Sequence, residues 1–280
     1  MRTKKLKTLA VAAITLTGSS LWSVETPAQT AWSILQDATS NKSADKRASA
    51  ARVLGLITRD PKAAAMAEKA LEDEKGDVRA AAATALGEMD ATGSIAKLRK
   101  ALSDKEPKVI LAAARSLVQL KDDPPAYEVF YAVLTGQQKT GQGLVASQLQ
   151  GLQNPKNLAE MGVGFVPFGG VGLFAFNALT KDDVSPVRAA AANALAKDPD
   201  PQTTKALVQA VSDKSWVVRV GALQAIAKRG DPALLKNIQG AMSDDKDVVR
   251  YTASAAVIRL TNLQQASKPE RETKQTKKKR

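Results

Sequence analysis

One apolar pattern recurs between residues 182 and 260 at a fixed distance of 31 residues. Each copy has apolar side chains at positions i, i+4, i+7 and i+8, the spacing of a helix that buries one face. An arginine follows each leading residue, and an aspartate precedes it by five positions. The three stripes are Val187, Ala191, Ala194 and Leu195; Val218, Ala222, Ala225 and Ile226; and Val249, Ala253, Ala256 and Val257. A fixed period in the range of about 20 to 50 residues is typical of stacked repeat arrays.

The same columns recur upstream, so the array covers most of the chain. Two copies lead with Val78 and Val109, and a weaker copy leads with Lys46. Lysine in the leading apolar column predicts a terminal repeat, which has no neighbour on one side. The 78 residues from Val109 to Val187 hold two periods of 31 and 16 further residues. The middle is therefore expected to contain one irregular repeat.

These patterns predict an all-α protein, an α-solenoid of about six to seven helix pairs with an irregular central repeat. A capping helix is expected over 32–39 and an ordinary repeat helix over 231–242. Proline fits the first turn of a helix, because the N–H it lacks has no partner there. Such starts are expected at Pro61, Pro107, Pro125, Pro186 and Pro232. The expected organisation is a secretory signal (1–28), N-terminal repeats (29–135), an irregular repeat with a Gly/Phe-rich apolar insertion (136–180), C-terminal repeats (181–263) and a disordered basic tail (264–280).

Composition removes most enzyme classes, because the chain has neither cysteine nor histidine. A thiolate nucleophile, a Cys/His zinc site and a Ser–His triad all need one of these residues. We expect no catalytic residue, no cofactor and no metal. The net charge is +13, but the two ends carry +3 and +5 of it, so the repeats themselves are nearly balanced. The sequence does not show the one-sided basic face that nucleic acid requires, so no nucleic-acid partner is expected.

The N-terminus has the pattern of a secretory signal. Basic residues precede a short apolar run over 9–16, which is too short to span a bilayer comfortably. Thr26-Pro27-Ala28 is a small-residue cleavage site, so the mature chain would start near Gln29. We therefore expect a protein exported to the periplasm or beyond the cell. An uncleaved N-terminal membrane anchor is the alternative.

The columns resemble HEAT repeats, specifically the short form of phycobilisome-lyase-like proteins (PBS lyase HEAT-like repeats). The resemblance covers about two thirds of the chain and rests on segments such as 77–87 and 185–195. It implies a superhelix of helix pairs whose concave face usually binds partners, and it implies no reaction. HEAT-like metal hydroxylases are similar in fold but use His-Glu ligand pairs, which this chain lacks.

The recurring arginines and aspartates predict a structural ladder. Each aspartate is expected to cap free N–H groups at a helix start, and each arginine to pair with a carboxylate of its own or the next repeat. Such a ladder would fix the stacking register; a ligand-binding role is the alternative. Arg47 lies in the same column. The ladder residues are Asp73, Arg79, Asp104, Asp182, Arg188, Asp213, Arg219, Asp244 and Arg250.

The stretch 161–179 is the one sharp anomaly, with no charged residue and a Gly169-Gly170 turn signal. Three interpretations remain open. Residues 171–180 form a helix of the irregular repeat, with 161–170 folded against the solenoid; the stretch dips into a membrane as a hairpin; or it is an exposed patch that receives a protein or a lipid chain. The expected partner or membrane contacts are Phe165, Phe168, Phe174 and Phe176.

The sequence thus predicts an exported, non-catalytic scaffold that binds another protein through its concave face, through the Gly/Phe-rich segment, or through both. One alternative is a peripheral membrane-associated protein held by 161–179 and the basic tail. Another is a lyase-like protein that handles a chromophore or ligand. A protein partner is expected and a membrane surface is an open possibility.

Overall fold

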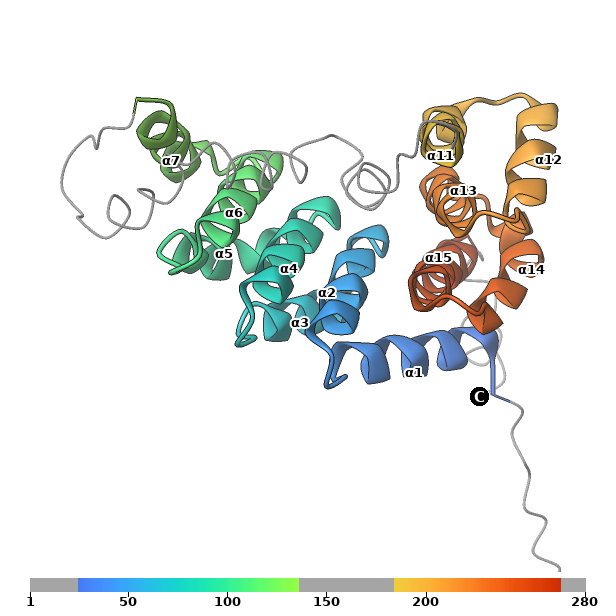
Figure 1. Ribbon diagram of the computed structural model, residues 1–280, viewed down its shortest axis with the longest axis horizontal. Helices are drawn as coiled ribbons and strands as arrows, with labels where there is room; N and C mark the ends of the chain where they lie inside the picture. Colours follow the sequence, from blue (N-terminus) through green and yellow to red (C-terminus); the bar gives the residue numbers. More distant parts are fainter. Residues whose placement is uncertain (1–24, 136–183, 268–280) are drawn as a thin grey trace, which may run out of the picture.

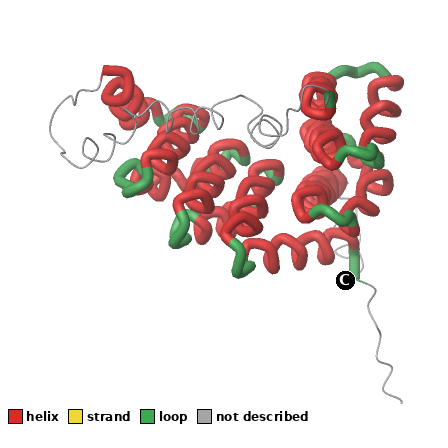
Figure 2. The backbone as a smooth tube through the Cα atoms, viewed as in Figure 1, coloured by secondary structure: helices red, strands yellow, loops and turns green. Residues whose placement is uncertain are grey.

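We analysed a computed structural model of the chain, which describes residues 25–135 and 184–267. Over these two ranges the chain is helical, with short loops and no strand (Figure 2). The expected all-α solenoid is confirmed. We call residues 25–135 the N-terminal arm and residues 184–267 the C-terminal arm. The irregular repeat and the basic tail after Ser267 lie outside the described residues.

The N-terminal arm contains one leading helix and three helix pairs. Its elements are α1 (Pro27–Thr39), α2 (Ala44–Val53) followed by the 3-10 turn η1 (Leu54–Leu56), α3 (Pro61–Ala70), α4 (Gly76–Glu88), η2 (Thr92–Ser94), α5 (Ile95–Ala101), α6 (Pro107–Gln119) and α7 (Asp123–Thr135). Helix α1 starts five residues before the expected capping helix. The reason is a capping box: Thr26 N–H donates to Gln29 Oε1 (2.8 Å) and Gln29 N–H donates to Thr26 Oγ1 (3.3 Å).

The C-terminal arm repeats the design with shorter outer helices. Its elements are α11 (Ser185–Ala194), η5 (Leu195–Lys197), α12 (Pro201–Ala210), α13 (Trp216–Arg229), η6 (Pro232–Leu234), α14 (Leu235–Ile238), η7 (Gln239–Ser243) and α15 (Asp247–Ala266). The single helix expected over 231–242 is wrong, because α14 is only four residues long between two 3-10 turns. Asn237 and Gly240 are poor helix formers, and they weaken this segment.

Prolines stand at helix starts as expected. Pro61 and Pro107 are the first residues of α3 and α6, and Pro232 is the first of η6. Pro186 is the second residue of α11, and Pro125 the third of α7. Each lies in a first turn, where the missing N–H leaves no helical bond unmade.

Small residues let neighbouring repeats approach closely. Ser116 Oγ on α6 donates to the Ala83 carbonyl of α4 (2.8 Å). On α13, a Cβ built at Gly221 would lie 2.8 Å from Ala189 Cα on α11, closer than real Cβ atoms come. The core is therefore a series of thin alanine-rich layers, each completed by the next repeat.

The two arms meet at the ends of the described chain (Figure 1). Helix α1 runs from the C-terminal arm to the foot of α2, and it packs on both α15 and α2. Helix α15 also packs directly against α2 and η1. Figure 1 shows α12 and α14 on the side of the C-terminal arm that faces away from the N-terminal arm. The first and last repeats in the sequence are thus neighbours in space.

Polar contacts cross this junction. Arg259 Nη1 on α15 donates to the Leu56 carbonyl (2.9 Å), and Asn262 Nδ2 donates to Asp60 Oδ2 (2.8 Å). Lys46 Nζ pairs with Asp247 (3.0 Å). The interpretation of the Lys46 copy as a terminal repeat without a neighbour is therefore wrong. Its lysine stands in an apolar column because it meets a carboxylate of α15.

The stripe on α11 is a second correction. Val187 and Leu195 are 66% and 39% exposed, and Ala191 and Ala194 are also exposed. The buried residues of α11 include Ala189 and Ala192 on its other side, and the helix packs closely on α13. Within residues 184–267, α11 is the first helix of the stack, so only the side toward the next repeat is covered. The corresponding stripes of α13 and α15 are buried.

Candidate functional site

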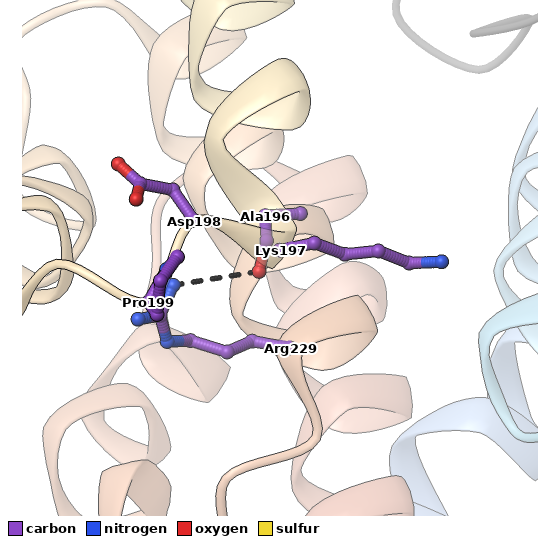
Figure 3. A pocket seen from close by; sticks show the side chains of 5 residues that line it. All are labelled: Ala196, Lys197, Asp198, Pro199 and Arg229. Carbon is purple, nitrogen blue, oxygen red and sulfur yellow. Dashed lines mark hydrogen bonds between the residues drawn. The ribbon is translucent and has the colours of Figure 1, made fainter.

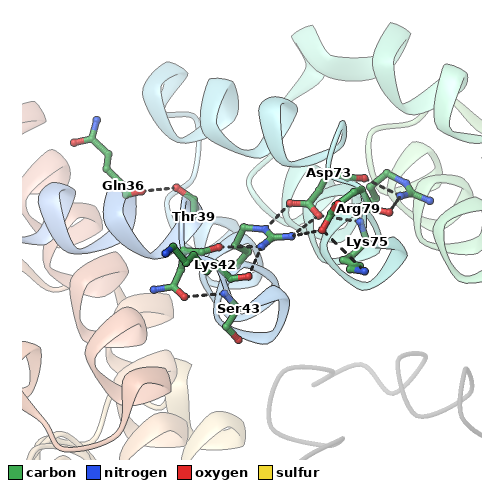
Figure 4. Close-up of polar contacts among 10 residues, drawn as sticks. Gln36, Thr39, Lys42, Ser43, Asp73, Lys75 and Arg79 are labelled. Atoms are coloured by element: carbon green, nitrogen blue, oxygen red, sulfur yellow. Dashed lines mark hydrogen bonds and ion pairs between the residues drawn. The ribbon is translucent and has the colours of Figure 1, made fainter.

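The predicted ladder residues lie in the turns before the first helix of each repeat. In the N-terminal arm, Arg47 donates through Nε and Nη2 to Asp73 (2.7 and 2.9 Å). Arg79 donates in the same way to Asp104 (2.7 Å for both atoms). Each arginine therefore reaches the aspartate of the following repeat. Figure 4 shows Asp73 and Arg79 within this set of contacts.

The C-terminal arm continues the arrangement. Arg188 Nη2 lies 2.5 Å from Asp213 Oδ2, and Arg219 Nη2 lies 2.7 Å from Asp244 Oδ1. Arg250 differs, because its guanidinium turns back to Asp247 on its own helix. Arg250 has no following repeat in sequence, although α2 is the next repeat in space.

The same guanidinium groups also hold the turn that precedes their own helix. Arg79 Nη1 donates to the carbonyls of Asp73 (2.8 Å) and Glu74 (3.1 Å). Arg219 Nη1 donates to the carbonyls of Asp213 (3.0 Å) and Lys214 (3.3 Å). One arginine thereby connects two successive inter-repeat turns, which is the geometry a register-fixing ladder requires. That the contacts set the register stays a prediction.

Each aspartate also accepts a backbone hydrogen bond. The donor is the N–H two residues later, as in Lys75 N–H to Asp73 Oδ1 (2.9 Å) and Ser215 N–H to Asp213 Oδ1 (2.9 Å). Lys75 and Ser215 are the N-cap residues of α4 and α13, so the aspartate closes an Asx turn just before the helix. The expected role was to cap the first helical turn itself. The hydrogen bond from Arg47 holds the pKa of Asp73 below its usual value.

Five predicted site residues lie outside the described residues. They are Asp182 of the ladder and the four phenylalanines Phe165, Phe168, Phe174 and Phe176. Their predicted roles stay predictions.

A second set of residues, which the sequence analysis did not single out, faces the space between the arms. These residues stand two positions before or after the last apolar residue of each stripe. The two positions are four residues apart, so they share one helix face. On that face we define the interior cluster as Arg52 of α2, Glu88 of α4, Arg115 of α6, Lys228 of α13 and Arg259 of α15.

Charges of the two arms interact across this interior. The carboxylate of Glu88, on the N-terminal arm, is stabilised electrostatically by Lys228 of the C-terminal arm and by Arg52 and Arg115. Desolvation nevertheless outweighs these charges and raises the pKa of Glu88. Burial likewise lowers the pKa of the Lys228 ammonium, against the attraction of Glu88. Both side chains touch solvent, but protein from two arms encloses them.

The two C-terminal cations are held by specific contacts. Lys228 Nζ donates to Asn193 Oδ1 (3.3 Å), and Asn193 Nδ2 donates to Gln224 Oε1 (3.3 Å). Arg259 Nη1 binds Leu56 O and Thr58 Oγ1 (2.8 Å) across the junction. The guanidinium of Arg259 is therefore fixed at the point where the arms meet.

A periodic signal for this face was present in the sequence. Lys197, Lys228 and Arg259 are 31 residues apart, and each stands two positions after the last apolar residue of its stripe. The column is basic only in the C-terminal arm, because Leu56, Glu88 and Gln119 occupy it in the N-terminal arm. Its orientation toward the other arm depends on how the chain closes.

A shallow cavity lies between η5 and the end of α13, with a volume of about 310 Å³. Arg229 Nη1 donates to the Ala196 carbonyl across it (3.4 Å). Figure 3 shows Asp198 pointing away from this contact and Lys197 extending toward the pale blue N-terminal helices. The cavity contains no arrangement of nucleophile and base, and we assign it no chemistry.

Two classes of site are not found in the described part of the chain. Within 25–135 and 184–267, no three His, Cys, Asp or Glu side chains are grouped so that they could hold a metal ion. No helix in these ranges is long and apolar enough to cross a membrane.

Comparison with known proteins identifies the repeats. A family model described as HEAT repeats matches residues 32–118, 64–140 and 174–258, which together are more than half of the chain. None of the curated proteins matches the sequence.

Several solved structures share the helical-repeat architecture. The complex of CpcE and CpcF of phycocyanin lyase from Nostoc sp. PCC7120 is 21% identical, covers 92% of this chain and 99% of that chain, and has a TM-score of 0.33. Human deoxyhypusine hydroxylase in complex with glycerol is 18% identical, covers 84% and 85%, and has a TM-score of 0.29. An engineered protein is 18% identical, covers 83% and 97%, and has a TM-score of 0.28.

Proposed function

This chain belongs to the HEAT-repeat family, and from that premise we propose that it is a non-catalytic scaffold that binds another protein between its two arms. HEAT repeats form extended surfaces on which partners dock, because stacking leaves one face of every inner helix free of the core. The observation that carries the proposal is the placement of that face. The positions it supplies from α2, α4 and α6 and from α13 and α15 line one shared interior, where Glu88 and Lys228 interact.

The residues on this face suit recognition rather than catalysis. They are long polar side chains, and those of Lys228, Asn193 and Gln224 are tied into one hydrogen-bonded chain. Preorganised polar groups around a concave surface fix the orientation of a bound partner. The absence of cysteine and histidine from the sequence also argues against the commonest nucleophiles and general bases.

We propose in addition that the protein is exported. The support is the basic and apolar pattern of residues 1–28. Cleavage after Ala28 would remove Thr26, the N-cap of α1. Mass determination of the mature protein from a periplasmic or extracellular fraction tests this proposal. A full-length chain confined to the cytoplasm would contradict it.

Site-specific photo-crosslinking tests the scaffold proposal in the cells that make the protein. A photoreactive amino acid replaces Gln224 on the interior side of α13, or the exposed Gln209 on the outer helix α12. We expect a discrete crosslinked protein from position 224 and none from position 209. Crosslinks of equal yield from both positions, or from 209 alone, would place the contact elsewhere.

The Gly/Phe-rich segment stays a predicted second contact. Because it lies outside the described residues, its test is independent of the interior. Deletion of 161–170 should weaken the crosslink from position 224 only if both surfaces hold the same partner.

A further inference from the structure

The interior cluster has more positive than negative charge, although the repeats as a whole are nearly balanced. Its four cations, Arg52, Arg115, Lys228 and Arg259, surround one carboxylate, that of Glu88. These residues come from five helices of two arms, and no two of them are neighbours in the sequence. The excess is therefore produced by the closure of the fold, and it creates a positive field inside the protein.

Enclosure strengthens that field. Burial lowers the pKa of Arg52, Lys228 and Arg259, because the surrounding protein replaces water that would otherwise stabilise their charges. A bound anion would restore the lost stabilisation. Arg259 is already fixed by Leu56 and Thr58, so an anion that meets it orders little additional side chain.

We propose that the interior cluster selects an acidic, extended protein segment as the partner element that enters between the arms. This inference rests on the proposed scaffold function and adds the chemical class of the ligand. Charge complementarity is the argument: cations on both arms can contact carboxylates that project from opposite sides of one extended chain.

The composition of the interior face favours a peptide over a nucleic acid. Glu88 lies among the cations, where it would repel a continuous row of phosphates but can accept backbone N–H groups of a peptide. Asn193 and Gln224 add amide groups beside Lys228. Single-stranded nucleic acids are usually bound with aromatic side chains for base stacking. No aromatic residue occupies the two interior columns in the described repeats.

Fluorescence anisotropy with the full chain tests the inference. The probe is a labelled ten-residue peptide of alternating glutamate and glycine, measured at low salt. Lys228→Gln should weaken binding about two- to fivefold, the range for one partly exposed charge pair. Glu88→Gln should strengthen binding by a similar factor, since it removes the one repelling carboxylate. A purely structural role of these residues would not shift affinity in opposite directions.

The matched control is Lys205→Gln on the outer helix α12, where the lysine is exposed. It removes the same charge but should leave the affinity unchanged. Attraction to the basic tail contributes equally to all variants, so only the differences matter. Equal weakening by Lys228→Gln and Lys205→Gln, or no gain from Glu88→Gln in a folded variant, would overturn the inference.

Two further outcomes separate this inference from the scaffold proposal. A single-stranded oligonucleotide of equal charge that binds more tightly, with the same dependence on Lys228 and Glu88, would replace the acidic segment with nucleic acid. Failure of the acidic probe to respond to these variants, while crosslinking from position 224 persists, overturns the ligand class and leaves the scaffold intact. Loss of the crosslink overturns both.

Discussion

Lys46 on α2 and Asp247 on α15 form an ion pair of 3.0 Å that joins the first repeat to the last helix. The pair marks a stacking order that differs from the order of the sequence, since α15 lies beside α1 and α2. Both side chains are about a third or more exposed, so the pair itself adds about 0–1 kcal/mol. The junction must be held mainly by apolar packing.

Leucine truncation on α1 tests that conclusion. Leu35 is fully buried, and Leu35→Ala should lower the free energy of unfolding by about 2–5 kcal/mol through lost burial and the cavity left behind. The matched control is Leu263→Ala on α15, where the leucine is 37% exposed. It should cost less than about 1 kcal/mol. Urea denaturation of the two variants measures the difference, and equal losses would show that α1 is not part of the core.

Two arginines of the ladder differ in burial, which predicts different effects of their removal. The Arg219 side chain is 12% exposed and that of Arg188 is 46% exposed, and each pairs with the aspartate of the next repeat. Arg219→Ala should cost about 2–4 kcal/mol, because it leaves a buried carboxylate and two turn carbonyls without their donor. Arg188→Ala should cost about 1 kcal/mol or less. Thermal melts compare the two; an unchanged melting temperature of Arg219→Ala argues against the ladder.

Acid should weaken the inter-repeat turns. Hydrogen bonds from Arg47 and Arg188 lower the folded-state pKa of Asp73 and Asp213. A carboxylate with a lowered folded pKa stabilises the fold above its unfolded pKa of about 3.9, and this contribution is lost as pH falls toward the folded value. The urea midpoint should therefore fall below about pH 4. Asp213→Asn should be less stable at neutral pH and show a shallower fall, whereas parallel curves would assign the acid sensitivity to other groups.

Close helix contact predicts opposite effects of two glycine substitutions. Gly221→Ala should destabilise the protein by about 1–3 kcal/mol, because the new Cβ would meet backbone atoms of Ala189 that have no room to move. At Gly240 no heavy atom lies within 4 Å of a built Cβ. Gly240→Ala should be neutral or stabilise by about 0.5–1 kcal/mol through helix propensity. Stabilisation by both variants would mean that α11 and α13 are further apart than described.

The sequence by itself determined the helices and their period. Stripes led by Val218 and Val249 are buried on α13 and α15, and Pro61 and Pro107 begin helices, because these features depend on contacts within one repeat and its neighbour. Where local propensity was weak, around Gly240, the expected helix broke into short turns. The arginine and aspartate columns were also visible, because a period of 31 brings them to equivalent places.

Only the tertiary structure decided which repeat packs against which. Alanine-rich faces are nearly interchangeable, so nothing local showed that α15 would meet α1 and α2, or that Val187 would be exposed at one end of the described stack. The interior cluster depends on the same decision. Glu88 and Lys228 are 140 positions apart, and their charges interact because closure of the two arms, a sum of many small packing terms, brings them to one space.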